Sequence, residues 1–169
     1  MQMRAVVITV SDKGYAGLRK DASGPALADA LRAMGAEVVA QAVVPDERAQ
    51  IAALLRQHAQ SGAVDLIITT GGTGAAPRDV TPEATRDVIT REMPGLAELL
   101  RWEGYHKTPL AVLSRGIAGL LGSCLIVNLP GSPRAVREGM ETLAGVLPHA
   151  VQMARGEDLE HKSETHERA

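Results

Sequence analysis

The sequence contains a single cysteine and few aromatic rings. Among its 169 residues there are one cysteine, one tryptophan, two tyrosines and no phenylalanine. A single cysteine excludes an intramolecular disulfide and a zinc site built from several thiolates, and Cys124, which lies in an apolar run, is expected in the core. The shortage of aromatic side chains leaves few platforms on which unpaired nucleic-acid bases could stack.

Long apolar stretches and an excess of positive charge are also missing. No run approaches the roughly 18 apolar residues of a membrane-spanning helix, and the N-terminus lacks the pattern of a secretory signal peptide. The formal net charge is −2, whereas duplex nucleic acid is held mainly by cationic side chains that neutralise phosphates. We therefore predict a cytoplasmic protein that binds neither membrane nor nucleic acid.

What is present is the alternating pattern of an α/β domain. The length predicts one domain, residues 1–155, followed by a polar tail at 156–169 that is expected to be mobile. Strand and helix signals alternate, which predicts helices packed on a largely parallel sheet. The expected strands are 4–10, 36–44, 65–70, 108–113 and 122–130. The expected helices are 25–35, a segment opening at Pro45-Asp46, two stretches within 82–104, and a long helix from Val136 to Val151 bent at Pro148.

The most informative stretch is DLIITTGGTGAAPRDVTPEAT, residues 65–85, in which an apolar strand runs into Gly71, Gly72 and Gly74. Ligands of open parallel sheets bind beyond the carboxyl ends of the strands. Glycines let backbone N–H groups approach a ligand, and Thr81-Pro82-Glu83 has the pattern of an N-cap followed by proline at the first helical position. A helix start of this kind attracts phosphate or carboxylate. The stretch predicts an anion site, and the alternative is a tight turn between strand and helix.

Two better-known glycine loops do not match this stretch. A P-loop requires lysine and serine or threonine directly after its glycines, and no lysine follows here. A dinucleotide-binding loop requires a further glycine where the chain has Pro77, and it follows the first strand of the fold rather than the third.

Charged residues beside the glycines suggest phosphate chemistry. Arg78 could hold a phosphate and Asp79 a hydrated Mg²⁺, and the alternative is a solvated surface ion pair. Asp46 begins the helix after the second expected strand, at the same edge of the sheet, and could share the Mg²⁺ with Asp79. Its alternative is an ordinary N-cap role.

Three further groups lie at the ends of expected strands. Gly131-Ser132-Pro133 repeats the pattern of a strand followed by a helix start and forms either a second anion pocket or a simple cap. Ser11 and Asp12 end the first strand and face the same cleft, unless they only form a turn. Arg115 could clamp a phosphate or form a surface pair.

Taken together, the motifs resemble the MogA/MoaB family of molybdenum-cofactor biosynthesis proteins, which includes the N-terminal domain of gephyrin. The resemblance extends from residue 4 to about residue 155. It rests on ITVSD (8–12), DASGP (21–25), VVPDE (43–47), TTGGTGAAPRDVTPEAT (69–85), REMPG (91–95), LSRGIAG (113–119) and LIVNLPGSP (125–133).

This resemblance implies a molybdopterin adenylyltransferase, MogA-like because both aspartates are retained. Such an enzyme transfers AMP from Mg-ATP to the terminal phosphate of molybdopterin and releases pyrophosphate. The resemblance implies that Asp46 and Asp79 are the catalytic, metal-binding carboxylates. It also implies that the segment Gly71, Gly72, Thr73 and Gly74 lines the nucleotide and phosphate region, and that Ser114 and Ser132 contact molybdopterin.

The family also sets expectations for fold and assembly. Its members have a three-layer α/β/α fold whose mostly parallel five-stranded sheet contains one antiparallel strand. They commonly form homotrimers, hexamers occur, and their product can pass to a separate molybdenum-insertion protein. Because related domains also act as scaffolds, the alternative function is a non-catalytic, MoaB-like molybdopterin-binding protein.

Overall fold

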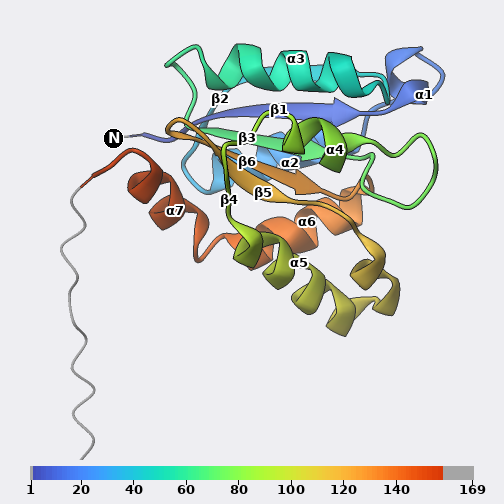
Figure 1. Cartoon of the computed structure of the whole chain (residues 1–169). Coiled ribbons are helices and arrows are strands. Elements are labelled where there is room, and N and C mark those ends of the chain that lie inside the picture. Colours follow the sequence, from blue (N-terminus) through green and yellow to red (C-terminus); the bar gives the residue numbers. More distant parts are fainter. Residues whose placement is uncertain (1, 158–169) are drawn as a thin grey trace, which may run out of the picture.

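The computed structural model describes residues 2–157, which form a sheet covered by helices on both faces (Figure 1). The sheet has six strands in the order β2-β1-β3-β6-β5-β4. Their bounds are β1 Arg4–Val10, β2 Glu37–Val44, β3 Leu66–Thr70, β4 Arg91–Glu92, β5 Ala118–Leu121 and β6 Cys124–Leu129. The first four strands in this order, β2, β1, β3 and β6, pair in parallel. By contrast, β5 is antiparallel to both of its neighbours, β6 and β4. The three-layer, mostly parallel fold predicted from the sequence is confirmed, with six strands instead of five.

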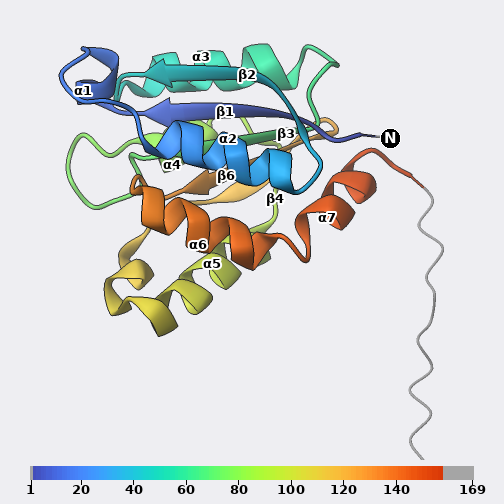
Figure 2. The ribbon, with the colours of Figure 1, turned by 180° about the vertical axis from the view of Figure 1, so that it is seen from behind.

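Most of the helices lie between successive strands of the sheet. Their bounds are α1 Asp12–Tyr15, α2 Ser23–Ala33, α3 Arg48–Ala59, α4 Thr81–Arg86, α5 Pro94–Lys107, the 3₁₀ helix η1 Pro109–Leu113, α6 Pro133–Leu143 and α7 Leu147–Ala154. All except α1 and the short η1 bury some of their residues. In Figure 1, α3 and α4 lie over one face of the sheet, and the reverse view of Figure 2 shows α2 and α6 over the other. Within residues 2–157, no helix combines the length and apolar character needed to cross a membrane.

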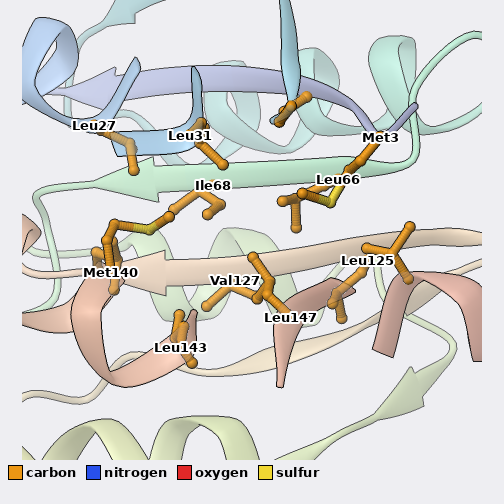
Figure 3. Packing of buried hydrophobic residues seen from close by; sticks show 14 of the residues in the cluster. Met3, Leu27, Leu31, Leu66, Ile68, Leu125, Val127, Met140, Leu143 and Leu147 are labelled. Atoms are coloured by element: carbon orange, nitrogen blue, oxygen red, sulfur yellow. The ribbon is translucent and has the colours of Figure 1, made fainter. Parts of the chain in front are cut away.

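Alternating side chains of the strands divide the core into two layers, because successive residues of a strand point to opposite faces. In β1, Ala5 and Val7 pack in the layer beneath α2, α6 and α7, whereas Val6, Ile8 and Val10 pack beneath α3 and α4. Figure 3 shows the first layer, where Leu27 and Leu31 of α2 and Met140 and Leu143 of α6 lie against the strands. Burial on both faces explains why these strands read as continuous apolar runs.

The predicted strand at 108–113 is wrong, because this segment forms η1. Pro109 has no N–H to donate to a ladder, and Leu110 and Leu113 are 72% and 63% exposed, which a strand inside this sheet would not allow. The one antiparallel strand that the family resemblance implied is β5, whose position was not predicted and which forms a hairpin with β6 across Gly122-Ser123. The two-residue edge strand β4 was not predicted either.

Three helix predictions also need correction. The expected long helix from Val136 to Val151 is two helices, α6 and α7, and Pro148 lies in the first turn of α7, where its missing N–H costs nothing. The α3 helix begins at Arg48 with Glu47 as N-cap, so Asp46 is not its cap. Thr81 is the first residue of α4 and not its cap. The predicted tail lies, from residue 158 on, outside the described residues.

Candidate functional site

A cavity of about 490 Å³ opens at the carboxyl ends of β1 and β3, beside the turn from β6 to α6. Figure 1 shows α1, the loop before α4 and the turn into α6 at this one end of the sheet. Seven of the predicted site residues line the cavity: Ser11, Asp46, Gly71, Gly72, Asp79, Gly131 and Ser132. Asp12, Thr73 and Gly74 are not among its lining residues, and Ser114 lines a separate cavity.

The glycine loop is held tightly against its neighbours. Gly71 and Gly72 have φ of 98° and 68°, a region that side chains disfavour. A Cβ on Gly71 would lie 2.3 Å from the carbonyl oxygen of Val10, and one on Gly72 would lie 2.3 Å from Oγ1 of Thr81. The Thr81 hydroxyl donates to the Gly71 carbonyl (2.9 Å), which fastens the start of α4 to the loop. The glycines are therefore required by close packing as well as by backbone conformation.

The carboxylates of Asp46 and Asp79 each present one free oxygen. Oδ2 of Asp46 accepts a hydrogen bond from the backbone N–H of Asp12 (2.9 Å), and Oδ2 of Asp79 accepts one from that of Ala76 (3.0 Å). Within residues 2–157, Oδ1 of each has no hydrogen-bond partner. Both side chains are thus oriented by the backbone while keeping an oxygen available to a ligand.

Negative charges are crowded around Asp46. Burial raises the pKa of Asp46 above its ordinary value, and the charges of Asp12 and Asp79 raise it further, although the backbone hydrogen bond between Asp46 and Asp12 opposes them. Asp46 and Asp79 line the same cavity. A cation between them would relieve the repulsion of their charges.

Arg78 does not extend into the cavity as a free phosphate ligand. Its guanidinium binds the carboxylate of Asp12 through two hydrogen bonds (2.9 and 2.8 Å) and also contacts Glu47. The hydrogen bond from Arg78 lowers the pKa of Asp12, helped by the backbone N–H of Asp46 (3.0 Å). The predicted ion pair of Arg78 exists, but with Asp12 and Glu47 instead of Asp79. Asp12 therefore holds Asp46 and Arg78 in position, although it does not itself line the cavity.

Arg115 fastens the outer part of the glycine loop. Its side chain donates to the carbonyl oxygens of Gly74 (2.8 Å) and Asp79 (2.7 Å) and pairs with Glu83 of α4. Its backbone N–H also donates to the carbonyl of Thr73 (2.8 Å). Of the two roles considered for Arg115, the structure shows a pairing role that holds the loop on α4.

The three predicted serines have different surroundings. Ser11 caps α1 through a hydrogen bond from Gly14, and Ser132 caps α6 through one from Ala135 (both 3.0 Å). Both still line the main cavity. Ser114 lines a smaller cavity of about 60 Å³ between α5 and α6. The family resemblance implied that Ser114 and Ser132 contact the same ligand, whereas in the structure they line two different cavities.

Sequence reasoning missed six polar lining residues: Thr9, Arg19, Lys20, Asp21, Ser23 and Thr70. The Asp21 carboxylate accepts hydrogen bonds from the Thr9 hydroxyl (2.8 Å) and the Gly24 N–H (2.9 Å). The spacing of Asp21 and Gly24 is typical of an aspartate that bonds to a helix start, and it could have indicated this role.

Comparison with known proteins gives consistent results. Residues 6–149 match the family model described as a probable molybdopterin binding domain. The chain is 38% identical over 152 residues to a protein from Helicobacter pylori J99 named molybdopterin adenylyltransferase, covering 89% of this chain and 86% of that one. It is 43% identical over 161 residues to the Drosophila melanogaster molybdenum cofactor synthesis protein cinnamon, covering 95% of this chain but 27% of that protein.

Solved structures give the same picture. The crystal structure of the molybdopterin biosynthesis enzyme MoaB from Thermus thermophilus superposes with a TM-score of 0.87 at 51% identity. The match covers 92% of this chain and 98% of the Thermus chain. The similarity therefore includes the whole fold around the cavity.

Proposed function

The chain belongs to the MogA/MoaB family of molybdenum-cofactor biosynthesis proteins, and on this basis we propose that it is a molybdopterin adenylyltransferase. The reaction would join the terminal phosphate of molybdopterin to the α-phosphate of ATP and release pyrophosphate. The observation that carries this proposal is the pair of oriented carboxylates, Asp46 and Asp79, whose open oxygens lie beside a glycine loop in one cavity.

This reaction depends on the positioning of the two phosphates and on stabilisation of their negative charge more than on a strong general base. A phosphate monoester is largely ionised at neutral pH, so a nucleophile of this kind needs little activation. Catalysis then rests on alignment of the two phosphates and on stabilisation of negative charge. Backbone N–H groups of the Gly71–Gly74 segment and the start of α6 at Ser132 are suited to orient phosphate oxygens.

The carboxylate pair also fits Mg²⁺, which enters with ATP. Proteins commonly hold Mg²⁺ with one or two carboxylates, while phosphates and water complete its octahedron. Within residues 2–157, no three or more histidine, cysteine, aspartate or glutamate side chains form a metal site of their own, so Asp46 and Asp79 would hold the ion together with the nucleotide. When bound there, Mg²⁺ supplies charge neutralisation to the phosphates.

The other family expectations belong to this proposal. A substrate that contacts both Ser132 and Ser114 would have to extend from the main cavity into the smaller one. We propose assembly as a homotrimer, with a hexamer as the alternative, and transfer of the product to a separate molybdenum-insertion protein. A cytoplasmic location also belongs to the proposal, because the reaction consumes ATP. Light scattering of the purified protein would distinguish the assemblies.

Pyrophosphate release tests the proposal. We expect release from ATP and Mg²⁺ that depends on molybdopterin, and we expect Asp79→Asn to abolish it without loss of molybdopterin binding. Asp29→Asn, which changes an exposed aspartate on α2, is the matched control and should retain full activity. Tight binding of molybdopterin with no release by the unmodified protein would favour the non-catalytic scaffold instead.

A further inference from the structure

The cavity carries more negative than positive charge, although its proposed substrates are themselves anionic. Its lining includes the carboxylates of Asp21, Asp46 and Asp79, and its cationic side chains are Arg19 and Lys20. Like charges at such short range disfavour binding of a phosphorylated ligand. Mg²⁺ would offset the charge of two carboxylates but not that of several phosphates in addition.

Other arginines near the cavity are already engaged. Arg78 is bound by Asp12 and Glu47, and Arg115 by Glu83 and two carbonyl oxygens. By contrast, within residues 2–157 the side chains of Arg19 and Lys20 form no hydrogen bond or ion pair, and both residues are exposed. These two cations can therefore turn to a ligand without breaking an existing contact.

The segment that carries them is fixed to the fold at both ends. On its N-terminal side, the backbone N–H groups of Leu18 and Arg19 donate to the carbonyl of Lys13 (2.9 and 3.3 Å). On its C-terminal side, Asp21 is bonded to Thr9 and Gly24. In Figure 1, the segment follows α1 at the end of the sheet that faces the cavity. The backbone thus presents Arg19 and Lys20 to the cavity, and only their side chains remain to be ordered.

From these observations we propose that Arg19 and Lys20 bind phosphate oxygens of the phosphorylated substrate, in the cavity that the carboxylate pair also lines. The inference rests on the proposed function for the identity of that substrate. The phosphate belongs either to the nucleotide triphosphate or to the molybdopterin monoester, and both offer the same charged acceptor oxygens. The two side chains lower the energy of the bound state and take no part in bond making.

Direct binding of inorganic tripolyphosphate tests this without turnover. Calorimetry at low salt should show binding by the unmodified protein and at least about tenfold weaker binding by the double variant Arg19→Ala/Lys20→Ala. Arg32→Ala, which removes an exposed arginine on α2, is the matched control and should bind as the unmodified protein does. The difference should shrink as salt screens the charges. Equal affinity of the double variant, or no binding by the unmodified protein, would overturn the inference.

Kinetics then identify the source of the phosphate. A rise of about tenfold in the KM for ATP at unchanged kcat assigns the two cations to the nucleotide, and the same rise in the KM for molybdopterin assigns them to the monoester. If neither KM changes, the inference is wrong. If the double variant unfolds at a lower temperature than the unmodified protein, the single variants Arg19→Gln and Lys20→Gln replace it in both experiments. Absence of turnover in the unmodified protein would refute the proposed function, whereas the tripolyphosphate comparison would still decide the inference.

Discussion

Asp46 carries a charge that the folded protein accommodates at a cost in stability. Its carboxylate lies near two others, and both burial and this proximity raise its pKa. An acid whose pKa is higher in the folded than in the unfolded state favours folding less as the pH rises between the two values. The folded protein therefore tolerates repulsion that a bound cation would relieve.

Asp46→Asn should consequently raise the thermal midpoint at pH 8 while abolishing adenylyl transfer. Asparagine keeps an oxygen to accept the Asp12 N–H, but it carries no charge. The gain over the unmodified protein should disappear at acid pH, where Asp46 is protonated. Melting curves from pH 4 to pH 8 measure this, and a lower midpoint at pH 8 would show that the charge stabilises the fold.

Gly71 permits a second test at the residue scale. Gly71→Ala should lower the free energy of unfolding by about 3 kcal/mol or more, because strain in the left-handed region is joined by a clash with Val10. Gly62 has a φ of 72°, but a Cβ added there would meet nothing within 4 Å, so Gly62→Ala should lose only about 1–2 kcal/mol. Equal losses in urea unfolding would mean that packing at Gly71 is unimportant.

At the scale of elements, the loop between β3 and α4 is shaped by contacts with residues distant in the sequence. Thr81 closes its inner end on Gly71, and Arg115 closes its outer end on Gly74 and Asp79. The orientation of Asp79 therefore depends on a side chain that precedes β5. A rigid loop keeps this carboxylate in place before substrate arrives.

Arg115→Ala should loosen the loop more than it destabilises the protein. We expect a loss of about 1 kcal/mol in unfolding free energy, because the side chain is partly solvent-exposed and its ion pair with Glu83 is screened. Turnover should fall at least about tenfold, since a misplaced carboxylate costs alignment. Hydrogen exchange of residues 72–80 should accelerate in the variant. Unchanged exchange together with unchanged turnover would exclude the role assigned to Arg115.

The elements predictable from the sequence are those whose local pattern agrees with their burial. Strands β1, β2, β3 and β6 follow from apolar, β-branched runs, and the site follows because Asp46 and the glycines come where such runs end. β4 is a pair of exposed charged residues and has no such pattern. The apolar residues of η1 misled the prediction because they lie on the surface.

The roles of Asp12, Arg78 and Arg115 were also beyond local reasoning. Arg78 meets Asp12 across 66 positions in the sequence, and Arg115 meets Glu83 across 32. Spacing and periodicity carry no information about such pairs. The sequence thus indicated residues that line one cavity, but not the network that orders them.

At the scale of the whole molecule, Asp65 links Arg4, at the start of β1, to Arg155, which follows α7. Asp65 directly precedes β3, so it lies at the opposite end of the strands from the cavity. It is 5% exposed, accepts hydrogen bonds from the backbone and side chain of Arg4, and pairs with Arg155, which follows α7. Burial would raise its pKa, but the hydrogen bonds from Arg155 and Arg4 outweigh it and hold the pKa of Asp65 well below the ordinary range. Its charge therefore stabilises the fold.

Asp65→Asn should lower the unfolding free energy by about 3 kcal/mol at pH 7, because it removes the buried carboxylate charge that pairs with Arg4 and with the nearly buried Arg155. The depressed pKa means that this stabilisation is complete above about pH 5 and is lost as the pH falls below about 4. Urea unfolding of the variant and the unmodified protein should therefore converge at acid pH. A constant difference across this range would point to packing instead of charge.

The central claim is that Asp46 and Asp79 act in adenylyl transfer to molybdopterin. Single-turnover transfer of label from α-³²P-ATP into the pterin product tests it most directly, with bound molybdopterin quantified in the same samples. We predict labelled product with the unmodified protein and with Asp29→Asn, and bound molybdopterin without labelled product for Asp46→Asn and Asp79→Asn. Labelled product at the normal rate from either of these two variants would contradict the account.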